Sequence, residues 1–318
     1  MPVAYNAFML PKVSIVVLNY NNWPDTVECL ESLMRLEYEN LEVLLVDNAS
    51  GTDASVFERR RAGFEQAFKE FSFIQTGKNS GYAGGNNAGI RRALENGAEW
   101  ILVLNNDTTV TPGFLGEMLQ FQYNKDFGNP RDFRNPDIGV GILGPKILEP
   151  DGRMWSLGGR FNWNFFSVTR GILDTKYQIP NTKYHSCDYL SGTAMLVHRS
   201  VFETIGLLPE AYFLYYEDFE FCLKARAAGF FVGVVPEAVI THKVSRATRA
   251  GSPLYVYYHF RNSLLFTRRN IKPPLRWAIY LFSIWWALKQ ATKLLIPYSR
   301  ANGGAGLKGM KDFWLWRY

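Results

Sequence analysis

The fold is decided by the stretch VSIVVLNYNNWPDTVECLESLMRLEYENLEVLLVDNAS, residues 13–50. It opens and closes on continuous apolar runs, Val13 to Leu18 and Leu41 to Val46, which are typical of buried parallel strands. Between the two runs, Pro24 suits the first turn of a helix, and the apolar residues that follow it keep the spacing of one helical face. Strand, polar loop, helix and strand form the repeating unit of a doubly wound α/β sheet.

A third apolar run, Trp100 to Leu104, continues the pattern further along the chain. Each of the three runs ends in polar residues, which are Asn19–Tyr20, Asp47–Asn48 and Asn105–Asn106–Asp107. In open α/β sheets, ligands bind beyond the carboxyl ends of the strands, where the strand order reverses. We therefore expect a ligand site built from these three polar tips.

The composition limits the class of protein. A chain of 318 residues with 47% hydrophobic and 15% aromatic content can bury a substantial core, which excludes a disordered or fibrous protein. The three cysteines are widely spaced and include no C-x-x-C pair, which indicates a reducing compartment. The first ten residues contain neither a basic segment nor an apolar segment typical of a signal peptide. These features predict a cytoplasmic protein.

The net charge of +6 is unevenly distributed along the chain. From Ala238 to Tyr318 there are fourteen Lys or Arg residues and a single acid, Asp312, whereas residues 1–237 are net acidic. We expect a ligand-binding and catalytic domain over residues 1–250 and a basic, Trp-rich helical region over residues 251–318. Its tryptophans follow no nucleic-acid-binding motif, so we expect an anionic membrane surface as its partner and no nucleic acid.

Residues 275–298 are helical in character, with an uncharged centre from Trp277 to Leu288. This centre is too short to cross a bilayer, because a spanning helix needs about 20 apolar residues. Its tryptophans suit a helix lying in the membrane interface, with basic residues on both sides of the uncharged centre. These basic residues are Arg268, Arg269, Lys272, Arg276, Lys289 and Lys293. A helix packed on the catalytic domain is the alternative.

Two segments suggest a nucleotide site. An acid at a strand end, such as Asp47, can accept hydrogen bonds from a ribose or a base, although a turn or a helix cap explains the Asp47–Asn48 pair equally well. A nicotinamide cofactor is excluded, because the first strand-to-helix turn contains no glycine. The loop Gly77 to Gly89 (GKNSGYAGGNNAG) lets backbone N–H groups approach a ligand closely, and a tight loop into a helix is its alternative interpretation.

Two further segments suggest a metal site and a base. Asp107 follows a buried strand, and together with His242 it would form a carboxylate and imidazole site for Mg²⁺ or Mn²⁺. Taken alone, Asp107 is explained as part of an Asn-Asp turn, and His242 is explained as a structural histidine. In YYEDFEFCLKARAAG, residues 215–229, Glu220 has a favourable partner in Lys224, whereas Asp218 has none and can take the proton of an attacking hydroxyl.

Taken in order, the motifs resemble those of inverting glycosyltransferases of family 2, which have the GT-A fold. The segments are VSIVVLNYN, LLVDNASGTD, GKNSGYAGGNNAGI, WILVLNNDT, DYLSGTAMLVHRSVFETIGLLPEAYFLYYEDFEFCLKARAAGF and AVITHKVS, and they cover roughly Val13 to Arg269. The resemblance is strongest to rhamnosyltransferase-type members that build cell-surface polysaccharide. It implies transfer of a sugar, from dTDP-rhamnose first and a UDP-hexose next, to a glycan or polyprenyl-diphosphate-linked acceptor at the inner face of the cell membrane.

The resemblance also implies residue roles. Asp218 would be the general base, and Asp107 and His242 would hold the metal ion. Asn105 stands where the family commonly has the first aspartate of D-x-D, which indicates modest metal affinity. The nucleotide and donor site would comprise Asn19, Tyr20, Asp47, Asn48, Asn79, Gly81, Gly85, Asn86, Asn106 and Asp107. The donor sugar and acceptor would be bordered by Ser191, Gly192, Thr193 and Glu217.

Two other classes of protein share parts of this pattern. A nucleotidyltransferase needs a basic, glycine-rich first loop to hold a triphosphate, and LNYNNWP has no basic residue. A catalytically inactive nucleotide-sugar-binding scaffold would not need to keep Asp218 and His242, both of which are present. The sequence gives no prediction of oligomeric state.

Overall fold

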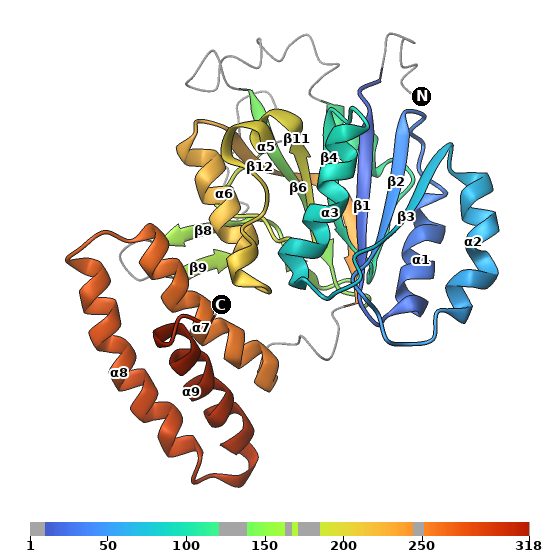
Figure 1. The fold of residues 1–318 in the computed structure, drawn as a ribbon. Helices are drawn as coiled ribbons and strands as arrows, with labels where there is room; N and C mark the ends of the chain where they lie inside the picture. Colours follow the sequence, from blue (N-terminus) through green and yellow to red (C-terminus); the bar gives the residue numbers. More distant parts are fainter. Residues whose placement is uncertain (1–9, 121–138, 163–166, 171–184, 244–250, 318) are drawn as a thin grey trace.

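The computed structural model describes residues 10–120, 139–162, 167–170, 185–243 and 251–317. Its N-terminal part is a sheet flanked by helices, and three C-terminal helices lie beside it (Figure 1). Pro24 lies in the first turn of the first helix, as predicted. The first elements are β1 (Val13–Asn19), α1 (Trp23–Leu33), β2 (Leu41–Asp47), α2 (Ser55–Ala67), β3 (Glu70–Gln75), α3 (Gly81–Glu95), β4 (Trp100–Asn105), β5 (Thr108–Val110) and α4 (Phe114–Leu119).

The second half of the sheet region contains strands of 2 to 12 residues together with helices α5 and α6. Its elements are β6 (Val140–Leu148), β7 (Met154–Ser156), β8 (Gly159–Asn162), β9 (Ser167–Arg170), β10 (His185–Ser186), β11 (Ala194–His198), α5 (Arg199–Ile205), η4 (Glu210–Tyr212), α6 (Glu217–Ala227) and β12 (Phe231–His242). The C-terminal elements are α7 (Pro253–Asn270), α8 (Leu275–Lys293), η5 (Pro297–Ser299) and α9 (Arg300–Trp314).

The central sheet is mostly parallel, as predicted. Within the described residues its strands run in the order β10-β12-β6-β11-β4-β1-β2-β3, with β5 beside β12 and β7 beside β6. Strand β1 lies between β2 and β4 and is parallel to both, with Asn19 opposite Asp47 and Leu18 opposite Asn105. The three polar tips therefore lie at one edge of the sheet. Strand β11 is antiparallel to both of its neighbours.

The two faces of the sheet are covered by different helices. Along β1, Ile15 belongs to a buried cluster with α1, α2 and α4, whereas Val16 belongs to a cluster with α3, α5 and α6. This separation follows from the period of a strand, in which successive side chains point to opposite faces. Because both faces are covered, the strands are continuously apolar.

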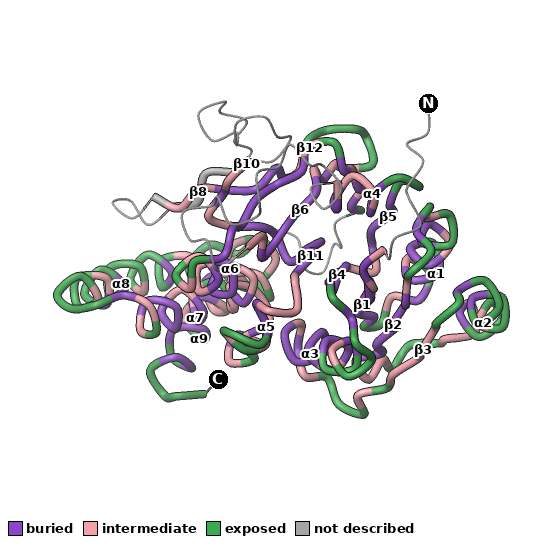
Figure 2. Tube along the Cα trace, turned by 90° about the horizontal axis from the view of Figure 1, so that it is seen from above, coloured by how far each residue is buried: buried purple, intermediate pink, exposed green. Residues whose placement is uncertain are grey.

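The three C-terminal helices share a third buried cluster, which includes Leu264 of α7, Tyr280 of α8 and Phe313 of α9. Helix α8 leaves most of its apolar side chains exposed, and Figure 2 shows it at the edge of the molecule. No helix in the described part of the chain combines the length and apolar character needed to cross a membrane. The exposed apolar residues of α8 are Leu275, Trp277, Leu281, Phe282, Ile284, Trp285, Trp286 and Leu288.

Candidate active site

Asn19 organises the tips of β1 and β2. Its Nδ2 donates to Asp47 Oδ1 at 3.0 Å and to Ser50 Oγ at 3.1 Å. Its Oδ1 accepts from Thr26 Oγ1 at 2.9 Å and from Asn106 Nδ2 at 3.2 Å. Because Asn19 is fully buried, these bonds hold the side chains of Asp47 and Asn106 in place from the interior of the protein. Tyr20, the next residue, is exposed at the same edge.

Asn48 connects the tip of β2 to the glycine-rich loop before α3. Its Nδ2 donates to Asn79 Oδ1 and to the Gly81 carbonyl, each at 3.0 Å. Gly81 has a φ of +72°, in the left-handed region that favours glycine. A Cβ atom on Gly85 would lie 2.6 Å from Leu18 Cδ1 and 3.0 Å from Asn48 Nδ2. The glycines thus allow the loop to lie directly against the strand tips.

Helix α3 already begins at Gly81, so most of the segment predicted as a loop over residues 77–89 is helical, and Asn86 leaves a buried acceptor in the second turn of this helix. Asn86 is fully buried and its Nδ2 donates to the Tyr82 carbonyl at 3.0 Å. Its Oδ1 has no hydrogen-bond partner among the described residues. An unpaired buried acceptor is costly, so a donor group of a ligand would satisfy it.

Asp107 and His242 meet at the same edge of the sheet. Asp107 follows β4, His242 ends β12, and the pairing of β12 with β5 aligns them, with His242 opposite Thr108. The Asp107 Oδ1 atom lies 3.1 Å from His242 Nε2, and both side chains are less than a tenth exposed. The His242 ring also contacts the Trp155 ring edge-on, at a centroid distance of 4.9 Å.

This pair fits a divalent cation. Adjacent ligands in an octahedral shell with bonds of about 2.1 Å are about 3 Å apart, which matches the separation of the two atoms. One carboxylate and one imidazole suit Mn²⁺ and are compatible with Mg²⁺. No cluster of three or more His, Cys, Asp or Glu side chains suited to a metal occurs in the described ranges. A cation here would complete its shell with water and the phosphates of a bound nucleotide.

Asp218, the second residue of α6, is held in a defined orientation. Its Oδ2 accepts from the Gly192 N–H at 2.9 Å and from the Tyr189 hydroxyl at 3.2 Å. Its Oδ1 accepts from the Phe219 N–H at 2.8 Å. The structure thereby brings the Ser191–Gly192–Thr193 segment against the predicted base. Ser191 Oγ and Thr193 Oγ1 are themselves hydrogen-bonded to each other at 3.0 Å.

Tyr82 is a site residue that sequence reasoning missed. It lies on α3 and its hydroxyl donates to the Gly192 carbonyl. Burial, followed by the negative charges of Glu217, Asp218 and Asp107, raises the pKa of this hydroxyl, so it stays protonated. Tyr82 therefore lies among the carboxylates predicted to serve the metal, the base and the acceptor. Its only signal in the sequence is its place inside the glycine-rich loop.

Glu217 lies next to Asp218 but in a different environment. It is buried, and its Oε2 has no hydrogen-bond partner among the described residues. Burial, and then the charge of Asp218, raise the pKa of the Glu217 carboxyl well above its ordinary value. Asp218, whose carboxylate accepts three hydrogen bonds, is the better candidate for the base.

Helix α7 fixes the segment that precedes these carboxylates. Phe213, Tyr215 and Tyr216 have φ values of 65°, 67° and 79°, a region that non-glycine residues adopt at a cost of about 1–3 kcal/mol each. Asn262 of α7 offsets this cost by donating to three carbonyls between Tyr212 and Tyr215, at distances of 2.7–3.0 Å. The helix therefore positions the residues that lead into Asp218.

Glu220 forms a second link between α6 and α7. Lys224 contacts its carboxylate at 2.7 Å, which confirms the predicted pair. Arg269 and Asn270 of α7 also donate to this carboxylate, at 2.8 and 2.9 Å. Burial alone would raise the pKa of Glu220, but these hydrogen bonds outweigh it and lower the pKa to about 2. Arg269 is thus paired with Glu220, while 36% of its side chain remains exposed.

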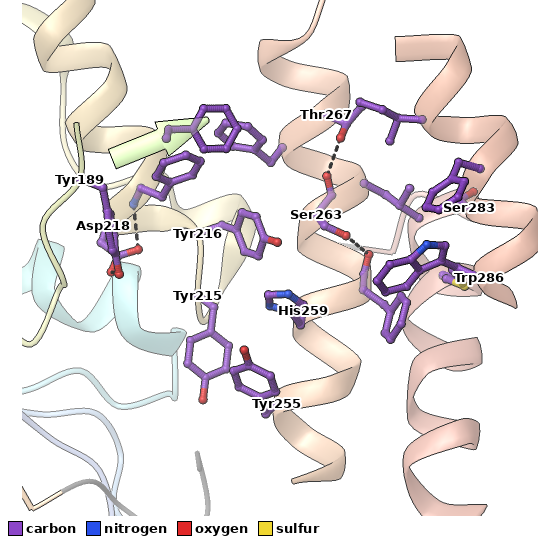
Figure 3. A pocket seen from close by; sticks show the side chains of 18 of the residues that line it. Tyr189, Tyr215, Tyr216, Asp218, Tyr255, His259, Ser263, Thr267, Ser283 and Trp286 are labelled. Atoms are coloured by element: carbon purple, nitrogen blue, oxygen red, sulfur yellow. Dashed lines mark hydrogen bonds between the residues drawn. The ribbon is translucent and has the colours of Figure 1, made fainter. Parts of the chain in front are cut away.

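A cavity of about 1160 Å³ opens beside Asp218, between the start of α6 and helices α7 and α8. Figure 3 shows Asp218 and Tyr189 at one end of it and Trp286 at the other. Most of its lining is aromatic. The predicted base therefore faces a space large enough for an acceptor.

Comparison with known proteins agrees with these features. The sequence profile described as "Glycosyl transferase family 2" matches residues 14–206, more than half of the chain. The low-salt glycan biosynthesis hexosyltransferase Agl10 of Haloferax volcanii is 28% identical over 262 residues, which cover 81% of this chain and 76% of that protein. The N-acetylglucosaminyl-diphospho-decaprenol L-rhamnosyltransferase of Mycobacterium tuberculosis is 24% identical over 296 residues, or 85% and 90% of the two chains.

A solved structure supports the fold. The mannosyltransferase PcManGT of Pyrobaculum calidifontis, in complex with GDP-Man and Mn²⁺, superposes with a TM-score of 0.57 at 16% identity, over 96% of this chain and 76% of that chain. The expected GT-A-like architecture with a mostly parallel sheet is thereby confirmed. Together with the profile match and the order of the motifs, this places the chain in glycosyltransferase family 2.

Proposed function

We propose that this glycosyltransferase is a metal-dependent, inverting enzyme that transfers a sugar from a nucleotide-sugar donor to a lipid-linked or glycan acceptor of cell-surface polysaccharide. The observation that carries the proposal is that the Asp107–His242 pair, at the edge of the sheet, and Asp218, at the start of α6, both lie near Tyr82, on whose hydroxyl the charges of Asp107 and Asp218 act. dTDP-rhamnose is the first candidate donor and a UDP-hexose the second. Both a rhamnosyltransferase and a hexosyltransferase are among the relatives of this chain, which supports testing both donors.

In this mechanism Asp218 takes the proton of the acceptor hydroxyl while the hydroxyl oxygen attacks the anomeric carbon. Hydrogen bonds from Gly192 N–H and the Tyr189 hydroxyl hold Oδ2 of the base in place. A single in-line displacement by a positioned hydroxyl inverts the anomeric centre. Asp107 and His242 would hold Mg²⁺ or Mn²⁺, whose charge would stabilise the departing diphosphate.

The nucleotide would lie over the tips of β1 and β2. Tyr20 is exposed there and can stack on a base, while Asp47, Asn48 and Asn79 offer hydrogen bonds to the nucleoside. The backbone at the N-terminus of α3, with Gly81 and Gly85, would border the phosphates. Asn106 would lie next to the phosphates, and the unpaired Oδ1 of Asn86 would accept a hydrogen bond from the nucleotide sugar.

A thermal-shift panel of nucleotide sugars tests this function directly. A ligand at a hundred times its dissociation constant adds about 2.7 kcal/mol to the apparent free energy of unfolding. We expect at least one nucleotide sugar, with dTDP-rhamnose tested first, to raise the melting temperature, and only when Mg²⁺ or Mn²⁺ is present. If every nucleotide sugar leaves the melting temperature unchanged with either metal, the proposed function is wrong.

We also propose that helix α8 docks the protein on the inner face of the cell membrane. Its exposed apolar side chains form one surface, with Lys289 beside Trp285 at 5.4 Å from the ring centre. Such a surface suits an interface in which apolar side chains enter the acyl boundary and basic groups face anionic headgroups. Lipid-linked acceptors would then be within reach of Asp218.

Vesicle co-sedimentation checks this docking. Full burial of one large apolar side chain is worth about 1.5–3 kcal/mol, so the double substitution Trp285→Ser and Leu288→Ser should weaken partition onto anionic vesicles by about a hundredfold. The matched control is Met34→Ser with Met154→Ser, which removes two apolar residues exposed elsewhere on the surface. Salt should also weaken binding of the unaltered protein. Equal sedimentation of both double variants would mean that α8 is not the docking surface.

A further inference from the structure

The cavity beside Asp218 changes character along its length. At the Asp218 end its lining is polar and aromatic, with the hydroxyl groups of Tyr189 and Tyr215 (Figure 3). Towards α8 the lining is mainly apolar, with Phe260, Phe282 and Trp286. The hydroxyl groups of Ser263, Thr267 and Ser283 also line this part, but each donates to a carbonyl of its own helix. A site for a free sugar alone would need polar groups throughout, because each buried sugar hydroxyl requires a hydrogen-bond partner.

The middle of the cavity is formed by α7. Tyr255 and His259 lie one helical turn apart and stack with ring centres 5.1 Å apart. Both can donate hydrogen bonds to a polar group that lies between the two ends of the cavity. The residues that line the cavity include no Lys or Arg. The phosphate groups that join the sugar to the isoprenoid chain must therefore stay hydrated, at the open side of the cavity between its two ends.

The apolar end is continuous with the exposed face of α8. Phe282 and Trp286 line the cavity, yet they are 55% and 39% exposed and belong to the surface we propose to meet the membrane. Their rings contact each other at a centroid distance of 6.0 Å, and Trp286 also contacts Phe260 at 5.3 Å. An apolar chain could therefore pass from the membrane into the cavity without crossing water.

We infer that this cavity binds a lipid-linked acceptor as an amphipathic molecule, with its sugar beside Asp218 and the first part of an isoprenoid chain between α7 and α8. The inference rests on the proposed function, since it assigns a place to the acceptor of that reaction. The volume of about 1160 Å³ exceeds the roughly 300–1,000 Å³ of ordinary ligand pockets, which leaves room for both parts of such a molecule.

Photo-crosslinking with an isoprenyl phosphate that carries a diazirine near the end of its chain tests the assignment on the full chain. We expect labels on residues of α7 and α8 that line the cavity. Ala278→Trp places a large ring at an exposed position of the cavity lining and should lower this labelling at least tenfold. Ala291→Trp, at an exposed position of α8 outside the lining, is the matched control and should leave labelling unchanged.

The outcomes separate the inference from the proposed function. Labels confined to outward residues such as Leu281 and Leu288, or equal labelling of the two variants, would overturn the cavity assignment. The nucleotide-sugar thermal shift, measured on the same proteins, reports on the donor site and not on this cavity. If Ala278→Trp still shows the thermal shift caused by a nucleotide sugar but is no longer labelled by the probe, both the cavity assignment and the proposed function are supported. If the unaltered protein is labelled but shows no thermal shift with any nucleotide sugar, only the proposed function is wrong.

Discussion

We expect Asp218→Asn to lower the rate of sugar transfer by about 10²–10⁴-fold, the usual contribution of a general base, while donor binding stays nearly unchanged. Asparagine keeps the size of the side chain, and its carbonyl oxygen can still accept from the Gly192 N–H that now binds Oδ2 at 2.9 Å. It cannot take a proton from the acceptor. The measurement is transfer under saturating donor, combined with the nucleotide-sugar thermal shift.

Glu217→Gln is the matched control for this substitution. Burial and the charge of Asp218 raise the pKa of Glu217, which favours its protonated form, and glutamine resembles that form closely. We therefore expect Glu217→Gln to lose much less activity than Asp218→Asn. If Asp218→Asn kept full turnover while Glu217→Gln abolished it, the base would be the other member of the pair.

The fold could be predicted because the signal lies in short local patterns. The apolar runs of β1, β2 and β4 are buried on both faces, so their sequences carry no alternation that would confuse the interpretation. Pro24 and the polar tips mark where each element begins or ends. The antiparallel direction of strand β11 could not be predicted, because its five residues, Ala194–His198, have the pattern of any short buried strand.

The residues of the candidate site could be proposed from the sequence, but most of the contacts between them could not. Asp107 and His242 were expected to share a metal because of the resemblance to the family, and the structure brings their side chains together. Tyr82 could not be found, because its role depends on reaching the Gly192 carbonyl more than a hundred residues away. The contacts of Asn262 and Arg269 with the α6 region were missed for the same reason, since the sequence alone does not show that α7 packs beside the base.

The second large effect concerns the metal. We expect Asp107→Ala and His242→Ala each to weaken metal-dependent binding of a nucleotide sugar by at least about a hundredfold, since loss of even an outer-shell partner costs 10–100-fold. His198→Ala is the control, because this half-buried histidine packs edge-on against Trp100 and lies away from the proposed metal pair. Titration of Mn²⁺ into protein with a saturating nucleoside diphosphate, followed by calorimetry, measures the effect.

The double variant decides whether Asp107 and His242 act through one ion. Their facing atoms are 3.1 Å apart, so both side chains can bind one cation, and either change would remove one of its two protein ligands. Residues that act through a common partner are non-additive, and the double substitution should therefore cost little more than the worse of the two single ones. Additive losses would indicate two independent binding contributions. If sugar transfer remained at its full rate in excess chelator, the reaction would not require a metal. Asp107 and His242 would then serve as a hydrogen-bonded pair that joins β12 to the turn after β4.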